Sequence, residues 1–153
     1  MRNLIRPGLA LVMATTFCAC GSTGTENATL LSQPLRSGAA RVQIVRPQEF
    51  LAALRDARIK VDGKKVADLT NGSSTTVDIA AGSHDITVDV WDSPSTYKMK
   101  LDAKPGTLYT LEVTVRREGA AVGMLGAAGA LADAATNENG GLFQIRVISD
   151  KPI

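Results

Sequence analysis

The sequence has few of the side chains that carry redox, metal or proton-transfer chemistry. Its two cysteines, Cys18 and Cys20, lie near the N-terminus, and His84 is its single histidine. A domain that begins after Cys20 has no disulfide to stabilise it and depends on the burial of apolar side chains. A lone histidine without neighbouring cysteines or paired carboxylates is also a poor metal site. We therefore predict no metal site and no cofactor.

A charge of one sign is lacking as well. The chain holds 17 Lys and Arg against 15 Asp and Glu, and Arg2 and Arg6 belong to a segment that we expect to be removed. The balanced remainder, without a basic patch interleaved with aromatics, predicts no nucleic-acid binding. The sequence has no phosphate-binding glycine motif, and its scattered carboxylates single out no hydrolytic pair. We predict no catalytic residues and a protein that is not an enzyme.

The N-terminal segment has the pattern of an export signal. Arg2 and Arg6 precede a short apolar run, Leu9–Ala14, and the stretch Phe17–Cys20 ends in a small residue followed by a cysteine. This stretch resembles the lipobox of bacterial lipoprotein signal peptides, with phenylalanine in the position that leucine usually holds. The resemblance implies a signal peptide over residues 1–19, cleavage after residue 19, and a diacylglycerol on the Cys20 thiol.

A transmembrane anchor and an ordinary secretory signal are the alternatives. A spanning helix needs about 20 apolar residues, and Thr15 and Thr16 close a much shorter run. Gly21 stands where aspartate retains lipoproteins in the inner membrane in enterobacteria-like sorting. We therefore expect a bacterial cell-envelope protein whose membrane partner is reached through the lipid on Cys20. The expected location is the outer membrane, facing the periplasm.

The mature chain divides into a tether and one domain. Residues 20–40 comprise the lipidated cysteine and a stretch of Gly, Ser, Thr, Asn and Pro with little apolar surface, which predicts a flexible tether. A coil of this length has a root-mean-square span of roughly 25 Å. Residues 41–150 have the size of a single domain with one modest core.

Alternating apolar and polar residues, typical of half-buried strands, recur along this domain. We expect seven or eight short strands separated by Gly and Pro turns, which predicts an all-β fold, a small β-sandwich with one short helix or loop insertion. The alternating residues are Val42 and Ile44, Ile59 and Val61, Val77 and Ile79, His84 to Val90, Tyr97 to Leu101, Tyr109 to Val115, and Phe143 to Val147.

Three turns and one helix complete the expected structure. Asp62-Gly63 predicts a two-residue type I′ hairpin, because both positions need positive φ. Asn71-Gly72 and Lys104–Thr107 predict further turns. The stretch Pro47–Ala57 carries an apolar stripe that predicts a helix, with a structured loop as the alternative.

Part of the domain resembles a known family. A strand, an Asp-Gly-Lys hairpin and an Asn-Gly turn are followed by Gly82-Ser83-His84 at the start of a long strand. This order is similar to the DUF2846 family and the related PEGA-type repeats, over roughly residues 41–111. The resemblance implies a small β-sandwich in a lipoprotein of unknown function, and the family offers no catalytic residues to carry over.

Two single residues admit a structural and a functional interpretation. By alternation His84 shares a face with Ile86 and Val88, so we expect it to pack at the core edge and to disfavour its charged form. Trp91 stands at a strand end, where we expect it to cover the rim of the core, with ligand stacking as the alternative.

Residues 119–132 form an apolar Gly/Ala-rich segment without charge, within an insertion that we place at 119–141. Small-residue spacing permits close helix contact or shallow membrane insertion. A loop or a docked helix is the simpler interpretation, and a membrane-contact or self-association device is the other. The glycines that would serve that device are Gly119, Gly123, Gly126 and Gly129.

These features predict a lipid-anchored envelope β-sandwich with a binding or structural accessory role. The expected partner is an envelope protein or polymer that the sequence does not identify. The alternative is a membrane-contacting or self-associating protein that acts through residues 119–132. An envelope hydrolase ranks third.

Overall fold

The structure is a computed structural model that describes residues 30–118, 121, 124–136 and 139–153. The expected signal peptide, Cys20, most of the tether, Gly119 and Gly123 lie outside these residues. None of the described helices is both long and apolar enough to cross a membrane.

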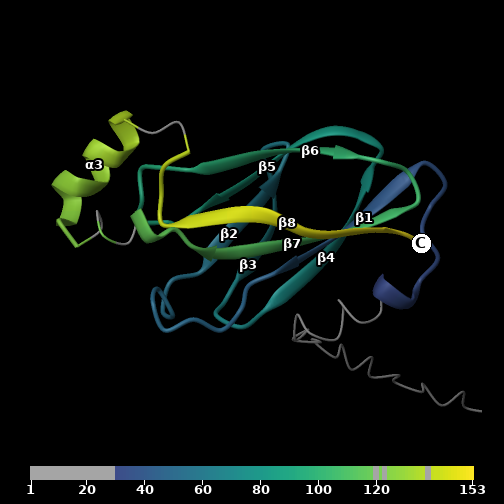
Figure 1. Ribbon diagram of the computed structural model, residues 1–153, viewed down its shortest axis with the longest axis horizontal. Coiled ribbons are helices and arrows are strands. Elements are labelled where there is room, and N and C mark those ends of the chain that lie inside the picture. Colours follow the sequence, from purple (N-terminus) through teal and green to yellow (C-terminus); the bar gives the residue numbers. More distant parts are fainter. Residues whose placement is uncertain (1–29, 119–120, 122–123, 137–138) are drawn as a thin grey trace, which may run out of the picture.

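Eight described strands form two four-stranded sheets that pack face to face as an all-β sandwich (Figure 1). One sheet has the order β4-β1-β7-β8 and the other β3-β2-β5-β6. The helix α3 (Gly126–Thr136) is inserted between the last two strands. The strands are β1 (Ala39–Val45), β2 (Ala57–Val61), β3 (Lys64–Leu69), β4 (Ser74–Ala80), β5 (Gly82–Asp89), β6 (Tyr97–Ala103), β7 (Thr107–Val115) and β8 (Phe143–Pro152).

The core lies between the two sheets and consists of the inward members of the alternating runs. Period-two alternation sends every second side chain of a strand to the same face. Ile44 and Leu111 from one sheet and Ile59 and Ile86 from the other are completely buried, and Phe143 is nearly so. The sandwich predicted from the alternation is therefore confirmed.

The strand order contains one parallel pair. Strands β1 and β7 pair in parallel, with Val42 opposite Tyr109 and Ile44 opposite Leu111. All other described pairs are antiparallel. The parallel pair lies at the centre of its sheet, flanked by β4 and β8.

The connections divide between two ends of the sandwich. The turn end carries residues 62–63, 81 and 104–106, together with the start of β1 and the end of β8. The loop end carries residues 46–56, 70–73, 90–96 and 116–142, including α3. Figure 1 shows α3 at one end of the molecule and the C-terminus at the other, beside the first described residues.

The predicted turns are confirmed. Asp62 and Gly63 have φ values of 50° and 77° in the hairpin that joins β2 to β3. Gly72 and Gly106 have φ values of 77° and 69°. Their turns join strands of different sheets, because β3 and β4, like β6 and β7, lie in opposite layers.

The predicted helix over Pro47–Ala57 is wrong, and the alternative of a structured loop is right. Residues 46–56 form turns and bends, and Ala52 has a φ of 57° that no α-helix accommodates. The stripe residues Phe50 and Leu54 are 96% and 100% exposed, so no core face was available to order them into a helix.

Trp91 also differs from the expectation. It is 75% exposed and therefore does not cover the rim of the core.

The strands extend slightly beyond the expected domain of residues 41–150, because β1 begins at Ala39 and β8 extends to Pro152. Before β1, the Gln33 carbonyl accepts a hydrogen bond from Arg41 Nη1 at 2.8 Å, so the last residues of the expected tether contact the sandwich.

Candidate functional site

The loop of residues 46–56 is held in place by a buried arginine. Arg46 continues the inward alternation of β1 and is 1% exposed. Its Nη1 donates to the carbonyls of Arg55 and Leu69, both at 2.6 Å, and its Nη2 donates to the Ala52 carbonyl at 2.8 Å. The guanidinium lies 4.6 Å from the centre of the Phe143 ring, a cation–π distance.

Burial also lowers the pKa of the Arg46 guanidinium, and the nearby carboxylates of Asp56 and Glu49 oppose this shift. Three backbone carbonyls, rather than a contacting carboxylate, accept from the terminal nitrogens of this buried cation, while its buried Nε has no hydrogen-bond partner. Since those carbonyls come from two loop positions and from the end of β3, the charge fixes the shape of the loop.

Polar contacts of Glu49 hold the beginning of the same loop. Its backbone N donates to Asn71 Oδ1 at 2.9 Å, and its carbonyl accepts from Asn71 Nδ2 at 3.0 Å. Its carboxylate accepts from the Val115 backbone N at 3.0 Å. The loop is thus joined to the β3–β4 turn and to the end of β7.

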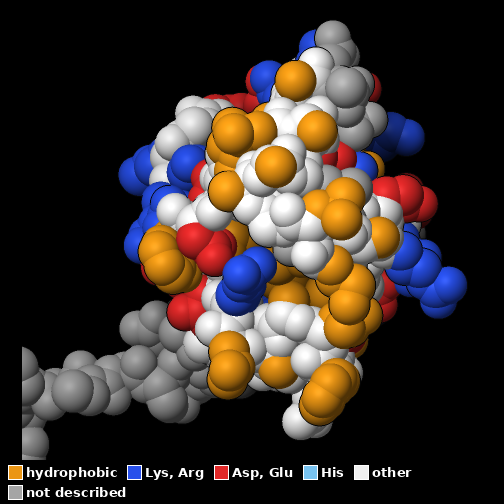
Figure 2. All heavy atoms as spheres, turned by 90° about the vertical axis from the view of Figure 1, so that its left-hand side faces the viewer, with side chains coloured by type: hydrophobic (Ala, Val, Ile, Leu, Met, Phe, Trp, Pro, Cys, Tyr) orange, Lys and Arg blue, Asp and Glu red, His pale blue; other side chains and the backbone are white. Residues whose placement is uncertain are grey.

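The loop held by these contacts presents apolar side chains to solvent. Figure 2, which looks onto the loop end, shows hydrophobic side chains gathered on this face with charged groups around them. Met124 and Leu125, just before α3, are 90% and 72% exposed. Large exposed apolar patches mark interaction sites more often than chance. The loop end is therefore the candidate functional site.

The apolar side chains border a groove of about 590 Å³, a volume typical of small-molecule sites. Arg55 is its one charged lining residue, and its guanidinium forms an ion pair with Asp92 at 3.1 Å. We call this the apolar groove. Its lining is Phe50, Leu51, Ala52, Ala53, Leu54, Arg55, Val115, Met124 and Leu142.

A second groove adjoins it, because Val115 lines both and Glu49 precedes Phe50 in the chain. This polar groove has a volume of about 340 Å³. Arg146 in it is already paired with Glu112 at 2.8 Å, whereas Arg117 and Glu118 form no ion pair with any described residue. Its lining is Glu49, Thr114, Val115, Arg117, Glu118, Gln144 and Arg146.

A second buried arginine fastens α3 to the sandwich. Arg116 Nη2 donates to both carboxylate oxygens of Asp133, at 2.6 and 2.5 Å, and Nε donates to the Gly141 carbonyl at 3.0 Å. Asp133 also accepts from the Gly141 backbone N at 2.9 Å. A Cβ at Gly140 would lie 2.9 Å from Ser95 Cβ and 3.0 Å from Asp133 Oδ2, so only glycine fits there.

The structure therefore resolves part of the Gly/Ala-rich segment into a docked helix. Gly126, with a φ of 68°, begins α3, and Gly129 lies within it. Gly119 and Gly123 lie outside the described residues, so the four glycines are not seen together as a contact surface. The pairing of Asp133 with Arg116 could not be predicted from the sequence, because their separation follows no local motif.

His84 occupies the turn end and differs from the expectation. Its side chain is only 14% exposed, yet Nδ1 lies 2.7 Å from Asp62 Oδ2 and Nε2 lies 2.9 Å from the Ala80 carbonyl. Both ring nitrogens face acceptors, which suits the doubly protonated ring. The hydrogen bond to Asp62 raises the pKa of His84, so the expected preference for the neutral form is wrong. The same bond lowers the pKa of Asp62.

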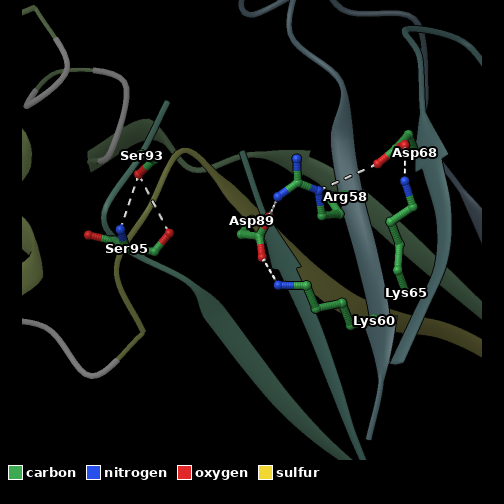
Figure 3. A network of polar contacts seen from close by, with 7 residues as sticks. All are labelled: Arg58, Lys60, Lys65, Asp68, Asp89, Ser93 and Ser95. Carbon is green, nitrogen blue, oxygen red and sulfur yellow. Dashed lines mark hydrogen bonds and ion pairs between the residues drawn. The ribbon is translucent and has the colours of Figure 1, made fainter. Parts of the chain in front are cut away.

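Asp68 and Asp89, two carboxylates of the second sheet, belong to ion pairs (Figure 3). Asp89 Oδ2 accepts from Lys60 at 2.5 Å, and its Oδ1 lies 3.4 Å from Arg58 Nη1. Asp68 accepts from Lys65 at 2.6 Å. At the strand end, Ser93 Oγ accepts from the Ser95 backbone N at 3.3 Å. Across the described ranges, no three His, Cys, Asp or Glu side chains gather as metal ligands would.

Comparisons with known proteins show a likeness to solved structures but to no sequence family. No protein-family model and no curated protein matches the sequence. The chain is similar to solved structures of the N-terminal domain of AlgF from P. aeruginosa, at 15% sequence identity and a TM-score of 0.40. The match covers 74% of this chain and 98% of that one.

Proposed function

We propose that this protein is a lipid-anchored cell-envelope protein whose β-sandwich has a binding or structural accessory role. The observation that carries the proposal is the sequence from Arg2 to Cys20, with its basic start, short apolar run and terminal cysteine. The lipid on Cys20 would hold the domain at the outer membrane, facing the periplasm. We also propose a relation to the DUF2846 and PEGA-like families.

The arrangement of the two ends supports a binding role. The described chain enters β1 at the turn end, so a tether from Cys20 would attach there (Figure 1). The loop end, with its exposed apolar side chains, would remain free to meet a partner. Fully burying one Phe, Leu or Met side chain contributes about 1.5–3 kcal/mol, so a few of them suffice for a specific contact.

The anchor is tested by replacing Cys20 with serine. The thiol is the site of acylation, and each buried methylene of an acyl chain contributes about 0.8 kcal/mol to membrane attachment. Cys20→Ser should abolish labelling by radioactive palmitate and leave the protein unprocessed or released from membranes. Cys18→Ser is the matched control and should behave as the wild type. A Cys20→Ser chain that is cleaved after Ala19 and stays in the membrane fraction would remove the proposal.

A second candidate is a membrane-contacting or self-associating role for residues 119–132, favoured by the exposure of Met124 and Leu125. Deleting residues 119–140 would also remove Asp133 and leave Arg116 unpaired, so point substitutions are the cleaner test. Met124→Ser with Leu125→Ser should reduce vesicle binding or dimer formation if this role is correct. Unchanged vesicle sedimentation and light scattering would exclude it.

We propose no catalytic activity, and an envelope hydrolase remains the third candidate. Its test is a screen of the purified protein for hydrolysis of envelope polymers. For the binding role, cross-linking in intact envelopes followed by affinity purification identifies the partner. Phe50→Ser, at a side chain 96% exposed, should reduce capture without altering the core.

A further inference from the structure

The apolar groove and the polar groove form one continuous amphipathic surface at the loop end. Val115 lines both of them. The apolar part exposes Phe50, Leu54 and Met124, and the polar part carries two arginines and two glutamates. Arg146 pairs with Glu112 and the Glu49 carboxylate accepts from the Val115 backbone N, whereas Arg117 and Glu118 have no hydrogen-bond or ion-pair partner for their side chains within the described part of the chain.

From this juxtaposition we propose that the loop end binds a single-chain amphiphile with a zwitterionic head group, such as a lysophosphatidylethanolamine. The acyl chain would occupy the apolar groove. The phosphate would meet Arg117, and the ammonium group would meet Glu118. The inference rests on the binding role proposed above and names its ligand class.

Charge and shape select this ligand. The Glu49 carboxylate is engaged by the Val115 backbone N and Arg146 by Glu112, so the charges of the polar groove left without a described partner are one cation and one anion, consecutive in the chain. A zwitterion complements such a pair better than an ion of either sign. The apolar groove has a volume in the range of small-ligand sites, which suits one chain rather than a flat protein surface. Arg46 holds the loop wall in its shape before any ligand arrives, which lowers the entropic cost of binding.

The test uses the acylated, full-length processed protein reconstituted in vesicles. Membrane attachment is first confirmed by flotation, which reports on the lipid anchor separately from the groove. A lysophosphatidylethanolamine with a photoreactive chain is then added, and the cross-linked peptides are mapped by mass spectrometry. We expect labelling within residues 50–55, 124 and 142, and little around Leu31 at the other end.

Variants assign the two halves of the site. Leu54→Asp should lower the labelling about tenfold or more, because it places a charge in the acyl groove. Leu31→Asp, at a leucine 40% exposed outside the groove, should leave it unchanged. Arg117→Ala should lower the labelling about two- to fivefold, the range of an exposed ion pair, and Arg36→Ala is its control. Equal thermal midpoints verify that the variants fold.

Probe chemistry decides between a single amphiphile and a bilayer surface. A photoreactive diacyl phosphatidylethanolamine should label the groove at least about fivefold less, and a monoacyl phosphatidylglycerol probe should label it more weakly than the zwitterion. Equal labelling by the diacyl probe would mean that the loop end docks on the bilayer, and would overturn the proposal. Absent or uniform labelling of a protein that still floats with the vesicles would overturn it while leaving the anchor intact.

Discussion

The turn end and the loop end of the sandwich are closed by different chemistry. At the turn end, short connections are joined by backbone hydrogen bonds, from Ala81 N to the Gly38 carbonyl and from Gly106 N to the Ala39 carbonyl, both below 3 Å. At the loop end, long connections are held by the buried guanidinium groups of Arg46 and Arg116. Apolar side chains can thus remain exposed on a long loop, provided that buried polar contacts fix the backbone of the loop.

The largest effect is expected for Asp133→Ala, which tests whether the loop end depends on its buried ion pair. The substitution leaves the Arg116 cation buried without its carboxylate, and breaking a buried pair in this way costs about 3–5 kcal/mol. Urea unfolding measures the loss. Asp150→Ala, in the exposed C-terminal half of β8, is the control, and replacing both partners by Arg116→Met and Asp133→Leu should recover much of the stability. A loss below 1 kcal/mol, on the scale of ordinary surface substitutions, would contradict the role of the pair.

Arg46→Met tests the other support of the loop end. Three carbonyls lose their donor, and we expect a destabilisation of about 2–4 kcal/mol. Hydrogen exchange followed by mass spectrometry should show faster exchange over residues 47–56, with the hairpin at residues 62–63 unchanged. Equal acceleration at both ends would show that the two ends are not separately held. Arg36→Met provides the matched control.

Gly63→Val tests the turn end at its tightest hairpin. Gly63 has a φ of 77°, and nothing lies within 4 Å of the position of a Cβ there, so the penalty is conformational rather than a clash. A β-branched residue in this backbone region should cost about 1–3 kcal/mol. Gly63→Asn should cost much less, because asparagine tolerates positive φ. Equal thermal midpoints for the valine variant and the wild type would contradict the expected backbone strain at position 63.

His84→Gln should give the smallest effect, less than about 1 kcal/mol, in the range of one hydrogen bond. The raised pKa of His84 means that the folded protein binds the proton more readily than the unfolded chain. Its stabilisation is therefore complete below the ordinary pKa of 6.5 and is lost as the pH rises through the folded-state pKa. Asp62 has a lowered pKa, and its contribution is lost only when acid protonates it.

Unfolding midpoints of the wild type and the Gln variant from pH 8 to pH 5 measure how the stabilisation by His84 depends on pH. The wild type should gain stability relative to the Gln variant on acidification. Asp62→Asn should remove most of the gain, because it removes the acceptor that faces Nδ1. If the difference in unfolding midpoint between the wild type and the Gln variant becomes smaller as the pH falls, His84 is buried in its neutral form.

Much of the fold follows from patterns that are local in the sequence. The alternation from Tyr109 to Val115 predicts a strand because burial on one face imposes a period of two, and Asp62-Gly63 predicts a hairpin because few residues tolerate positive φ. Sheet order does not follow in this way. The parallel pairing of β1 with β7 joins segments far apart in the chain, and no local residue choice encodes it.

The candidate site was harder to foresee, because its organising residues are charged and buried. Arg46 lies in phase with the buried residues Val42 and Ile44, so alternation predicts an inward side chain. Arginine is seldom fully buried, however, so its residue type predicts the opposite. The apolar stripe of Phe50, Leu51 and Leu54 predicts a helix packed on the core, but the structure leaves these side chains exposed to solvent. His84 is partly buried in phase with Ile86, as alternation predicts, but its partner Asp62 lies in a turn that alternation does not describe.

The central parallel pair has a consequence for how the chain is made. β1 has no neighbour on one side until β7 exists, and β7 in turn needs β8 to complete its sheet. Loop closure over such separations makes folding slow and late, since distant segments must meet before either is stabilised. In a nascent chain the sheet β4-β1-β7-β8 would remain incomplete until its last strands were synthesised. We propose above that this protein crosses a membrane before it folds. Late completion of this sheet would keep the polypeptide unfolded during export and postpone its folding until it reaches the cell envelope.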